Sequence, residues 1–136
     1  MRKKNALTMV VFALILGGCA GSFSKQMEGA IGGDVVLGSI YPHNGATQVP
    51  INAIITIDVY NGTASYQVYS QDNEGRIHYL SGLRREERDT SGAVDFRRYF
   101  FQPSPYFPSQ TVIYIDITYF GGSGNKYYTR SWFSTQ

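Results

Sequence analysis

This sequence has little cysteine, little charge and little histidine, and each shortage excludes a class of protein. One Cys in 136 residues excludes an intramolecular disulfide framework and a Cys-based zinc cluster. Charged residues make up only 16% of the chain, which argues against a helical bundle. The two histidines, His43 and His78, stand in no metal-ligand spacing. We therefore expect no metal and no cofactor, and the length leaves room for one domain.

Aromatic residues and glycine are abundant instead. The chain has 11 Tyr, 8 Phe, 1 Trp and 15 Gly, a composition that favours an all-β domain. Apolar residues alternate with others over 53–60 and again over 112–119, as in strands with one buried face. Turn-forming residues at 71–75 and 121–125 predict two hairpins. Including 35–41, 65–70, 76–80, 94–101 and 126–134, we expect about seven short antiparallel strands.

The N-terminus reads as an export signal. A basic cluster at residues 2–4 precedes an apolar run over 6–16. That run is too short to span a bilayer as a permanent helix, which takes about 20 residues. Gly17 and Gly18 then supply the small residues of a cleavage site, and Cys19 follows.

Residues 16–19, Leu-Gly-Gly-Cys, resemble the lipobox of bacterial lipoproteins. The resemblance implies lipid transfer to the thiol of Cys19 and cleavage before that residue. Several acyl chains on one residue would anchor the protein stably to a membrane, since each buried CH2 contributes about 0.8 kcal/mol. Because residue 20 is Ala rather than Asp, the family's sorting rule favours the outer membrane if the host is Gram-negative. The alternative is an ordinary signal peptide with a Cys at its end by chance.

Three segments follow from this assignment. We expect a lipoprotein signal peptide over 1–18, a lipidated flexible tether over 19–34, rich in Gly and Ser, and a β-sandwich domain over 35–136. Cleavage removes three of the 12 basic residues and no acidic ones, so the formal charge changes from +2 to 9 − 10 = −1. The apparent basicity therefore belongs to the signal peptide, and we expect no nucleic-acid partner.

The stretch over 39–57 resembles the opening of bacterial immunoglobulin-like domains of the S-layer-protein type. It reads Ser-Ile-Tyr-Pro-His-Asn-Gly-Ala-Thr-Gln-Val-Pro-Ile-Asn and continues into an alternating strand. Residues 107–111 and the closing Phe133-Ser134-Thr135 resemble the same family more loosely, whereas the charged stretch over 83–95 departs from it. The resemblance implies an immunoglobulin-like β-sandwich in an extracytoplasmic setting. It implies no catalytic activity.

No catalytic motif is present, so we expect a protein that is not an enzyme. Two sequence features are suited to contact with a partner. The arginines Arg84, Arg85 and Arg88 are suited to phosphate or acidic groups but lie among acidic residues, which predicts a self-neutralised loop as the alternative. The aromatics Tyr106 and Phe107 lie among prolines and form either an exposed patch or part of the core.

The function expected from these features is that of a membrane-anchored envelope lipoprotein. Its non-catalytic domain would act by protein–protein contact, as an accessory or structural component of a cell-envelope assembly. The alternative is a carbohydrate-binding surface module that uses exposed aromatics, motivated by the excess of Tyr. A flat row of two or three exposed aromatic side chains on one sheet face would favour this alternative.

Overall fold

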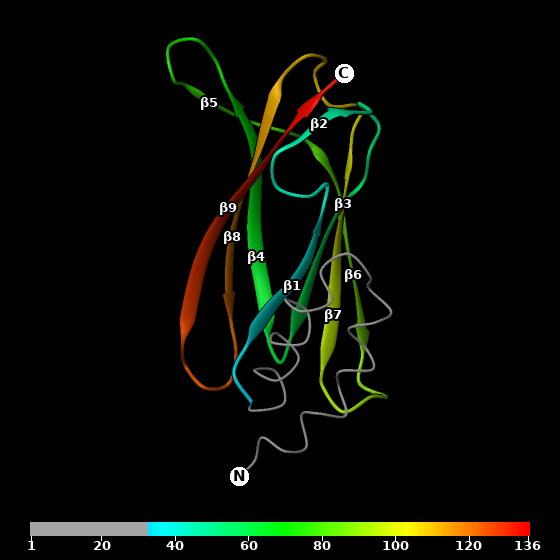
Figure 1. Ribbon diagram of the computed structural model, residues 1–136, viewed down its shortest axis with the longest axis vertical. Coiled ribbons are helices and arrows are strands. Elements are labelled where there is room, and N and C mark those ends of the chain that lie inside the picture. Colours follow the sequence, from blue (N-terminus) through cyan, green and yellow to red (C-terminus); the bar gives the residue numbers. More distant parts are fainter. Residues whose placement is uncertain (1–32) are drawn as a thin grey trace.

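The computed structural model describes residues 33–136, and these form an all-β sandwich of two sheets (Figure 1). The first sheet, sheet A, has four strands in the order β1-β3-β7-β6, and the second, sheet B, has five in the order β2-β9-β8-β4-β5. Sheet A contains β1 (Val36–Tyr41), β3 (Ile55–Tyr60), β6 (Gly82–Asp89) and β7 (Phe96–Pro103). Sheet B contains β2 (Ala46–Val49), β4 (Thr63–Gln71), β5 (Ile77–Tyr79), β8 (Val112–Phe120) and β9 (Lys126–Thr135).

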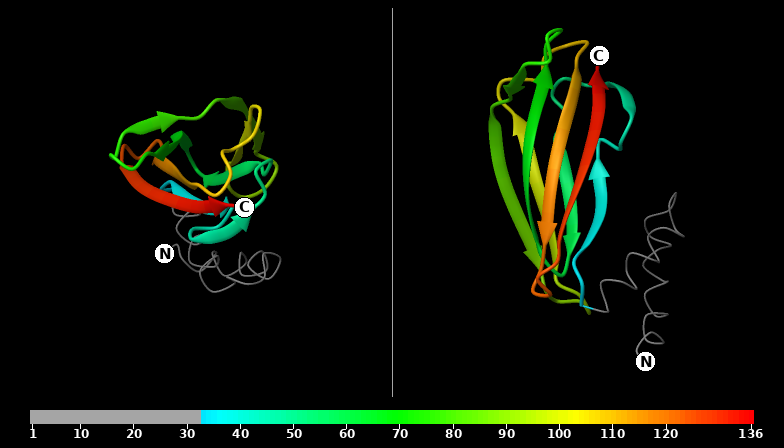
Figure 2. Two further views of the ribbon diagram at one scale, coloured as in Figure 1. Left: turned by 90° about the horizontal axis from the view of Figure 1, so that it is seen from above. Right: turned by 90° about the vertical axis from the view of Figure 1, so that its left-hand side faces the viewer.

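The strand order is that of an immunoglobulin-like sandwich. If the short strands β2 and β5 are set aside and the other seven are lettered A to G along the chain, sheet A reads A-B-E-D and sheet B reads G-F-C. This is the constant-type immunoglobulin arrangement. The expected fold class is therefore confirmed, and Figure 2 shows the strands of both sheets running along the long axis of the domain.

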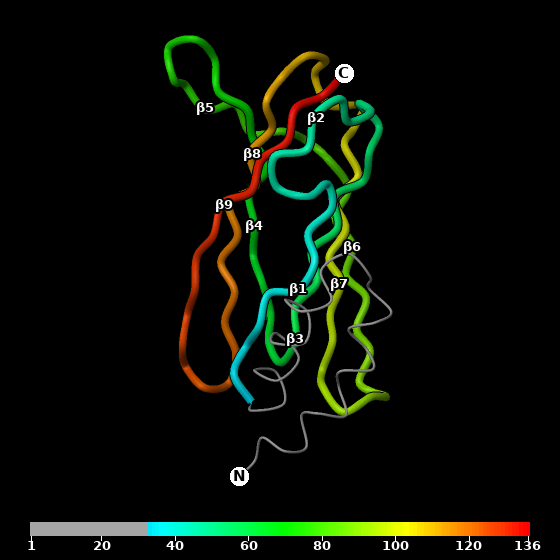
Figure 3. Tube along the Cα trace, viewed as in Figure 1, coloured from blue at the N-terminus to red at the C-terminus, as the bar shows by residue number. Residues whose placement is uncertain are grey.

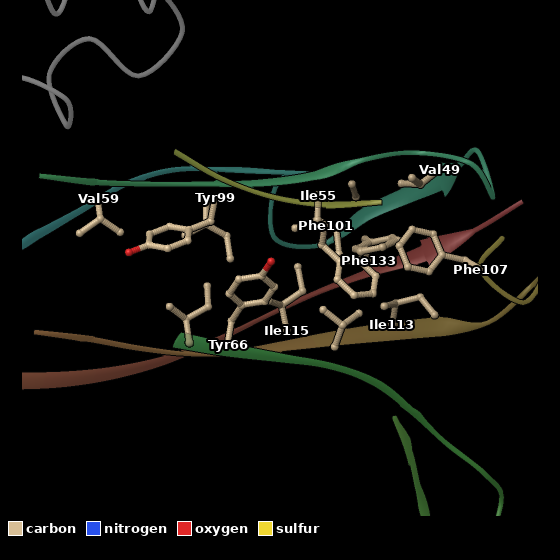
Figure 4. Packing of buried hydrophobic residues seen from close by; sticks show 14 of the residues in the cluster. Val49, Ile55, Val59, Tyr66, Tyr99, Phe101, Phe107, Ile113, Ile115 and Phe133 are labelled. Atoms are coloured by element: carbon tan, nitrogen blue, oxygen red, sulfur yellow. The ribbon is translucent and has the colours of Figure 1, made fainter. Parts of the chain in front are cut away.

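The alternating stretches of sequence build the core. Ile55, Ile57 and Val59 of β3 point inward and are fully buried, as are Ile113 and Ile115 of β8. The two sheets close over these side chains and over the aromatic rings between them (Figure 4). Phe101 stacks on Phe107, and Phe107 meets Phe133 edge to face at 5.4 Å. Cross-sheet packing of branched and aromatic side chains thus holds the sandwich together without a disulfide.

The structure has nine strands where about seven were expected. The two additional strands are β2, which pairs in parallel with β9, and β6, which pairs with β7 along its whole length. The stretch over 83–89 was interpreted as part of a solvated charged loop, and this was wrong. Seven of the eight residues of β6 are exposed, so apolar alternation is absent there, and backbone pairing to β7 makes the strand. Charges are typical of an edge strand because they discourage pairing with other chains.

The two ends of the sandwich differ in what they carry. The described chain enters at Gly33, beside the turns β3–β4, β6–β7 and β8–β9, and we call this the proximal end. The β4–β5 hairpin, the loop over 104–111 and the C-terminus lie at the opposite, distal end (Figure 3). At the proximal end Asp34 accepts hydrogen bonds from Ser123 Oγ at 3.1 Å and from Tyr127 Oη at 2.7 Å. The domain therefore has a defined point at which the chain enters.

Candidate interaction surfaces

The three arginines of the expected contact do not form one patch. Side chains of a strand alternate between faces, so Arg84 and Arg88 lie on the side of β6 that faces the sandwich, and Arg85 lies on the outer face. Arg84 sits 4.4 Å from the centroid of the Tyr66 ring and donates to the Tyr66 carbonyl oxygen at 3.0 Å. Its guanidinium thus covers the edge of the core, which is a structural role.

The other two arginines are also engaged. Arg88 makes two hydrogen bonds to Asp95, both at 2.9 Å, and they lower the pKa of the Asp95 carboxyl. Arg85 pairs with Glu87 and lies 3.9 Å above the centroid of the Phe100 ring. The basic cluster therefore neutralises itself, and of its three members Arg85 alone stands on an outer sheet face.

The remaining expected site residues separate in the same way. Tyr106 is 60% exposed at the distal end, so its ring is available to a partner. Phe107 is only 2% exposed and packs between Phe101 and Phe133, so its assignment as a contact residue was wrong. The prolines on either side of these two residues gave no indication of which ring points inward. In the structure the ring of Phe107 lies in the core. Cys19 and the segments 1–18 and 19–32 lie outside the described residues.

The exposed large hydrophobic side chains are distributed unevenly along the domain. Among residues 33–136 there are ten of them, and eight lie in the distal half. Only Phe120 and Tyr128, near the β8–β9 turn, lie toward the proximal end. The distal eight are Tyr41, Ile54, Ile77, Tyr79, Leu83, Tyr106, Val112 and Trp132. An apolar surface gathered at one end of a domain is typical of a contact site.

The first group of these residues lies on the outer face of sheet A. Tyr41 of β1 is 53% exposed and Leu83 of β6 is 68% exposed, and Ile54 alternates with the buried Ile55 just before β3. Between them the half-buried Phe100 lies under Arg85. We call Tyr41, Ile54, Leu83, Arg85 and Phe100 the sheet A patch.

A charge pair bounds this patch on its proximal side. The Arg98 guanidinium donates to both carboxylate oxygens of Asp58, at 2.7 and 2.9 Å. The Asp58 side chain is only 5% exposed, so its charge is compensated at short range rather than by water. The pair lies between the apolar side chains of the distal half and the Tyr60–Phe96 ring pair in the proximal half of the same face.

The second group lies on the outer face of sheet B and forms a row. Tyr79, Tyr69, Tyr114 and Trp132 come from the adjacent strands β5, β4, β8 and β9, and each is the direct register partner of the next. Strands are spaced about 4.8 Å apart, so the row crosses about 14 Å of the sheet. We call these four residues the aromatic row. Its two end members, Tyr79 and Trp132, are exposed, whereas the ring of Tyr79 is turned by 65° from that of Tyr69, so the row is not flat.

The inner members of the row are held in place. Tyr69 is only 3% exposed, stacks on Tyr114 with ring centroids 5.4 Å apart, and donates from Oη to Asp116 at 3.0 Å. Burial is the main cause that raises the pKa of Tyr69. Arg130 donates to both oxygens of Asp116, which lowers the pKa of that carboxyl. The hydrogen bond from Tyr69 to Asp116 thus joins the aromatic row to the Asp116–Arg130 pair.

Neither histidine takes part in a metal-ligand cluster. His78 lies on β5, 3.2 Å from Asp72, and His43 is exposed in the loop before β2. Within residues 33–136 no group of three or more His, Cys, Asp or Glu side chains could hold a metal ion. The same residues contain no helix long and apolar enough to cross a membrane.

Comparisons with known proteins support the fold. No protein-family model matches the sequence, and no curated protein matches it. Among solved structures the chain is similar to PcoC, a methionine-rich copper resistance protein from Escherichia coli, with a TM-score of 0.53 and 11% identity over 74% of this chain and 96% of that one. CopC from Methylosinus trichosporium OB3b aligns with a TM-score of 0.49 and 8% identity, over 75% of this chain and 93% of that one.

The likeness to PcoC extends to the fold alone. All three Met residues of this chain, at positions 1, 9 and 27, lie outside the described residues. A methionine-rich region therefore has no counterpart in the sandwich of this chain. What the two proteins share is the arrangement of strands, at an identity too low to transfer a ligand.

Proposed function

We propose that this chain is a membrane-anchored lipoprotein of the cell envelope whose immunoglobulin-like domain acts by protein–protein contact. In this proposal the domain is not an enzyme. It serves as an accessory or structural component of an envelope assembly, lipid-anchored through Cys19, in the outer membrane if the host is Gram-negative. The lipobox-like residues 16–19 support the anchor.

The observation that carries the contact role is the gathering of exposed apolar side chains at the distal end. Eight of ten such side chains lie in the half of the domain that is remote from Gly33, where the described chain begins. A chain anchored through residue 19 is tethered to the membrane through the proximal end. The distal end then faces away from its own membrane, and its apolar side chains are placed to meet a partner.

Within the distal end, the sheet A patch is the part best suited to a protein. It combines two aliphatic side chains, Ile54 and Leu83, with an aromatic ring at Tyr41 and an arginine at Arg85. Aromatic residues and arginine are enriched in the energetically dominant positions of protein interfaces. The Asp58–Arg98 pair supplies a polar rim beside this apolar centre.

The experiment is affinity capture of crosslinked, detergent-solubilised envelopes with the full chain and its Leu83→Asp variant. Leu83 is 68% exposed, so a carboxylate there should leave the fold intact while placing an unpaired charge in the interface. We expect capture of a discrete partner by the parent chain and a loss of about tenfold or more in the variant. Tyr128→Asp, at a position 74% exposed on sheet B near the proximal end, is the matched control. Equal capture by all three chains would contradict the assignment of the patch.

A further inference from the structure

We propose that the aromatic row on the outer face of sheet B binds carbohydrate, as a platform for an uncharged polysaccharide. This goes beyond the protein contact proposed for sheet A, because it uses the opposite face of the sandwich. The sequence indicated sugar binding as an alternative, from the number of Tyr residues alone. The structure supplies a place for it, in four aromatic side chains aligned across four strands.

The two end members of the row offer ring surface. Tyr79 is 65% exposed, and its ring is turned by 65° from the plane of Tyr69. Trp132 is 37% exposed, and Gly45 lies against one edge of its indole: a Cβ there would come within 3.8 Å of Cζ2. The glycine itself places no side chain on this edge of the indole. Aromatic faces of this kind pack against the C–H face of a sugar ring.

The middle of the row makes the platform rigid. Tyr69 and Tyr114 are stacked with an angle of 21° between their planes, and Arg130 lies 5.9 Å and 5.8 Å from the two ring centroids. Their rings are therefore already ordered before any ligand arrives. Tyr and Trp have few rotatable bonds, so the entropy lost on binding is small.

The charges beside the row favour a neutral, hydroxyl-rich ligand. The next cross-strand row contains Gln67, Asp116 and Arg130, and the last two neutralise each other through two hydrogen bonds. An ionic ligand would gain no attraction from a compensated pair. Sugar hydroxyls, in contrast, can donate to the remaining lone pairs of Asp116 and accept from Gln67 and Arg130. Thr118 extends this polar margin toward the proximal end, where it lines a shallow hollow.

Trp132 makes the test direct because it is the single Trp of the chain. The full chain in detergent is mixed with insoluble cellulose and with chitin as neutral probes, and with a sulfated polysaccharide as a charged probe. Depletion of protein from solution measures binding. With soluble oligosaccharides of the same polymers, a blue shift of the tryptophan emission reports burial of the indole.

We expect depletion by at least one neutral polymer together with a blue shift, and little binding of the sulfated probe. Tyr79→Ala should weaken binding about tenfold, an effect worth about 1.4 kcal/mol. Tyr41→Ala, at a similarly exposed position on sheet A, should bind as the parent chain does. An unchanged emission spectrum of unliganded Tyr79→Ala would show that the variant is folded.

Four results would overturn the proposal, three of them from the binding assays. These are no depletion and no spectral shift with any polymer, a preference for the charged probe, or equal losses for Tyr79→Ala and Tyr41→Ala. Capture of an envelope protein that is lost with Tyr79→Ala, in place of any glycan, would also overturn it and would assign the row to a protein. The proposed protein contact on sheet A is tested independently, by affinity capture with the Leu83→Asp variant.

Discussion

At the scale of single residues, Asp34 links the start of the domain to its last hairpin. Its carboxylate accepts hydrogen bonds from the Val35 backbone N–H, from Ser123 Oγ and from Tyr127 Oη. The hydrogen bond from Tyr127 is the main cause that lowers the pKa of Asp34 below its ordinary value. The same contact raises the pKa of the Tyr127 phenol. The two residues therefore stabilise the domain through the ionised carboxylate.

This pair predicts a dependence of stability on pH. Because the pKa of Asp34 is lower in the folded chain than in the unfolded chain, its contribution is present above the unfolded value and is lost as the pH falls through the folded value. Urea unfolding between pH 6 and pH 2.5 should show a falling free energy of unfolding. Asp34→Asn should make that fall shallower, and Tyr127→Phe should do the same by removing the donor. Slopes identical to the parent chain in both variants would rule out this role.

The residue scale is also where sequence reasoning was least successful. Tyr106 and Phe107 are adjacent aromatics among prolines, and the sequence shows no difference between them that would reveal which ring is 60% exposed and which 2%. That difference depends on Phe101 and Phe133, which come from two other strands. The aromatic row was missed for the same reason, since its members are separated by up to 63 positions, 132 − 69, and only register brings them together.

At the scale of elements, two turns pack against each other at the proximal end. Gly62, in the β3–β4 turn, lies so close to the Phe120 carbonyl oxygen that a Cβ would overlap it, and Val35 Cγ2 would be only 2.6 Å away. Gly121, in the β8–β9 turn, is similarly close to the Asn61 carbonyl oxygen. These glycines are required by the close approach of two backbones rather than by their φ angles.

We therefore expect Gly62→Ala to lower the free energy of unfolding by about 1–3 kcal/mol, because the added methyl group must displace backbone. Gly92 is the matched control, since a Cβ there would meet no atom within 4 Å. Gly92→Ala should change stability by less than about 1 kcal/mol. Urea denaturation of the three chains measures both values. A Gly62→Ala variant as stable as Gly92→Ala would show that the turns adjust freely.

Strands were predictable from the sequence where burial of one face requires apolar residues at alternate positions. β8 alternates between buried and more exposed positions, and the apolar residues of β3 recur at every second position. The hairpin turns beside β5 and β9 have turn residues, so these strands were located from sequence as well. β6 is exposed along seven of its eight residues, and β2 is four residues long in a parallel pairing. Both strands are formed by backbone hydrogen bonds to a neighbouring strand rather than by burial of alternate side chains. Neither therefore shows an apolar period in the sequence.

At the scale of the whole molecule, the two outer sheet faces share a design. Each has apolar or aromatic side chains in the distal half and a bidentate Asp–Arg pair beside them, Asp58–Arg98 on sheet A and Asp116–Arg130 on sheet B. If the chain is anchored through residue 19, both faces are carried away from the membrane on the same rigid body. A protein contact on one face and a glycan contact on the other are then sterically compatible.

The anchor makes its own prediction. Because residue 19 is the single Cys, Cys19→Ser should abolish incorporation of labelled palmitate and leave a chain that retains residues 1–18. Labelling in a bacterial host, with mass measurement of the product, checks both effects. Ser24→Ala is the control in the same region and should be labelled and cleaved like the parent chain. Palmitate label persisting in Cys19→Ser would refute the lipobox assignment.

The most direct test of the proposed contact places a photocrosslinking amino acid at position 83 in living cells, where the envelope is intact. Position 120, also an exposed apolar residue but at the proximal end, is the comparison. The account predicts a discrete crosslinked adduct with another envelope protein from position 83 and none from position 120. Absence of an adduct at position 83, or the same adduct from both positions, would contradict the claim that the distal end of sheet A is the working surface.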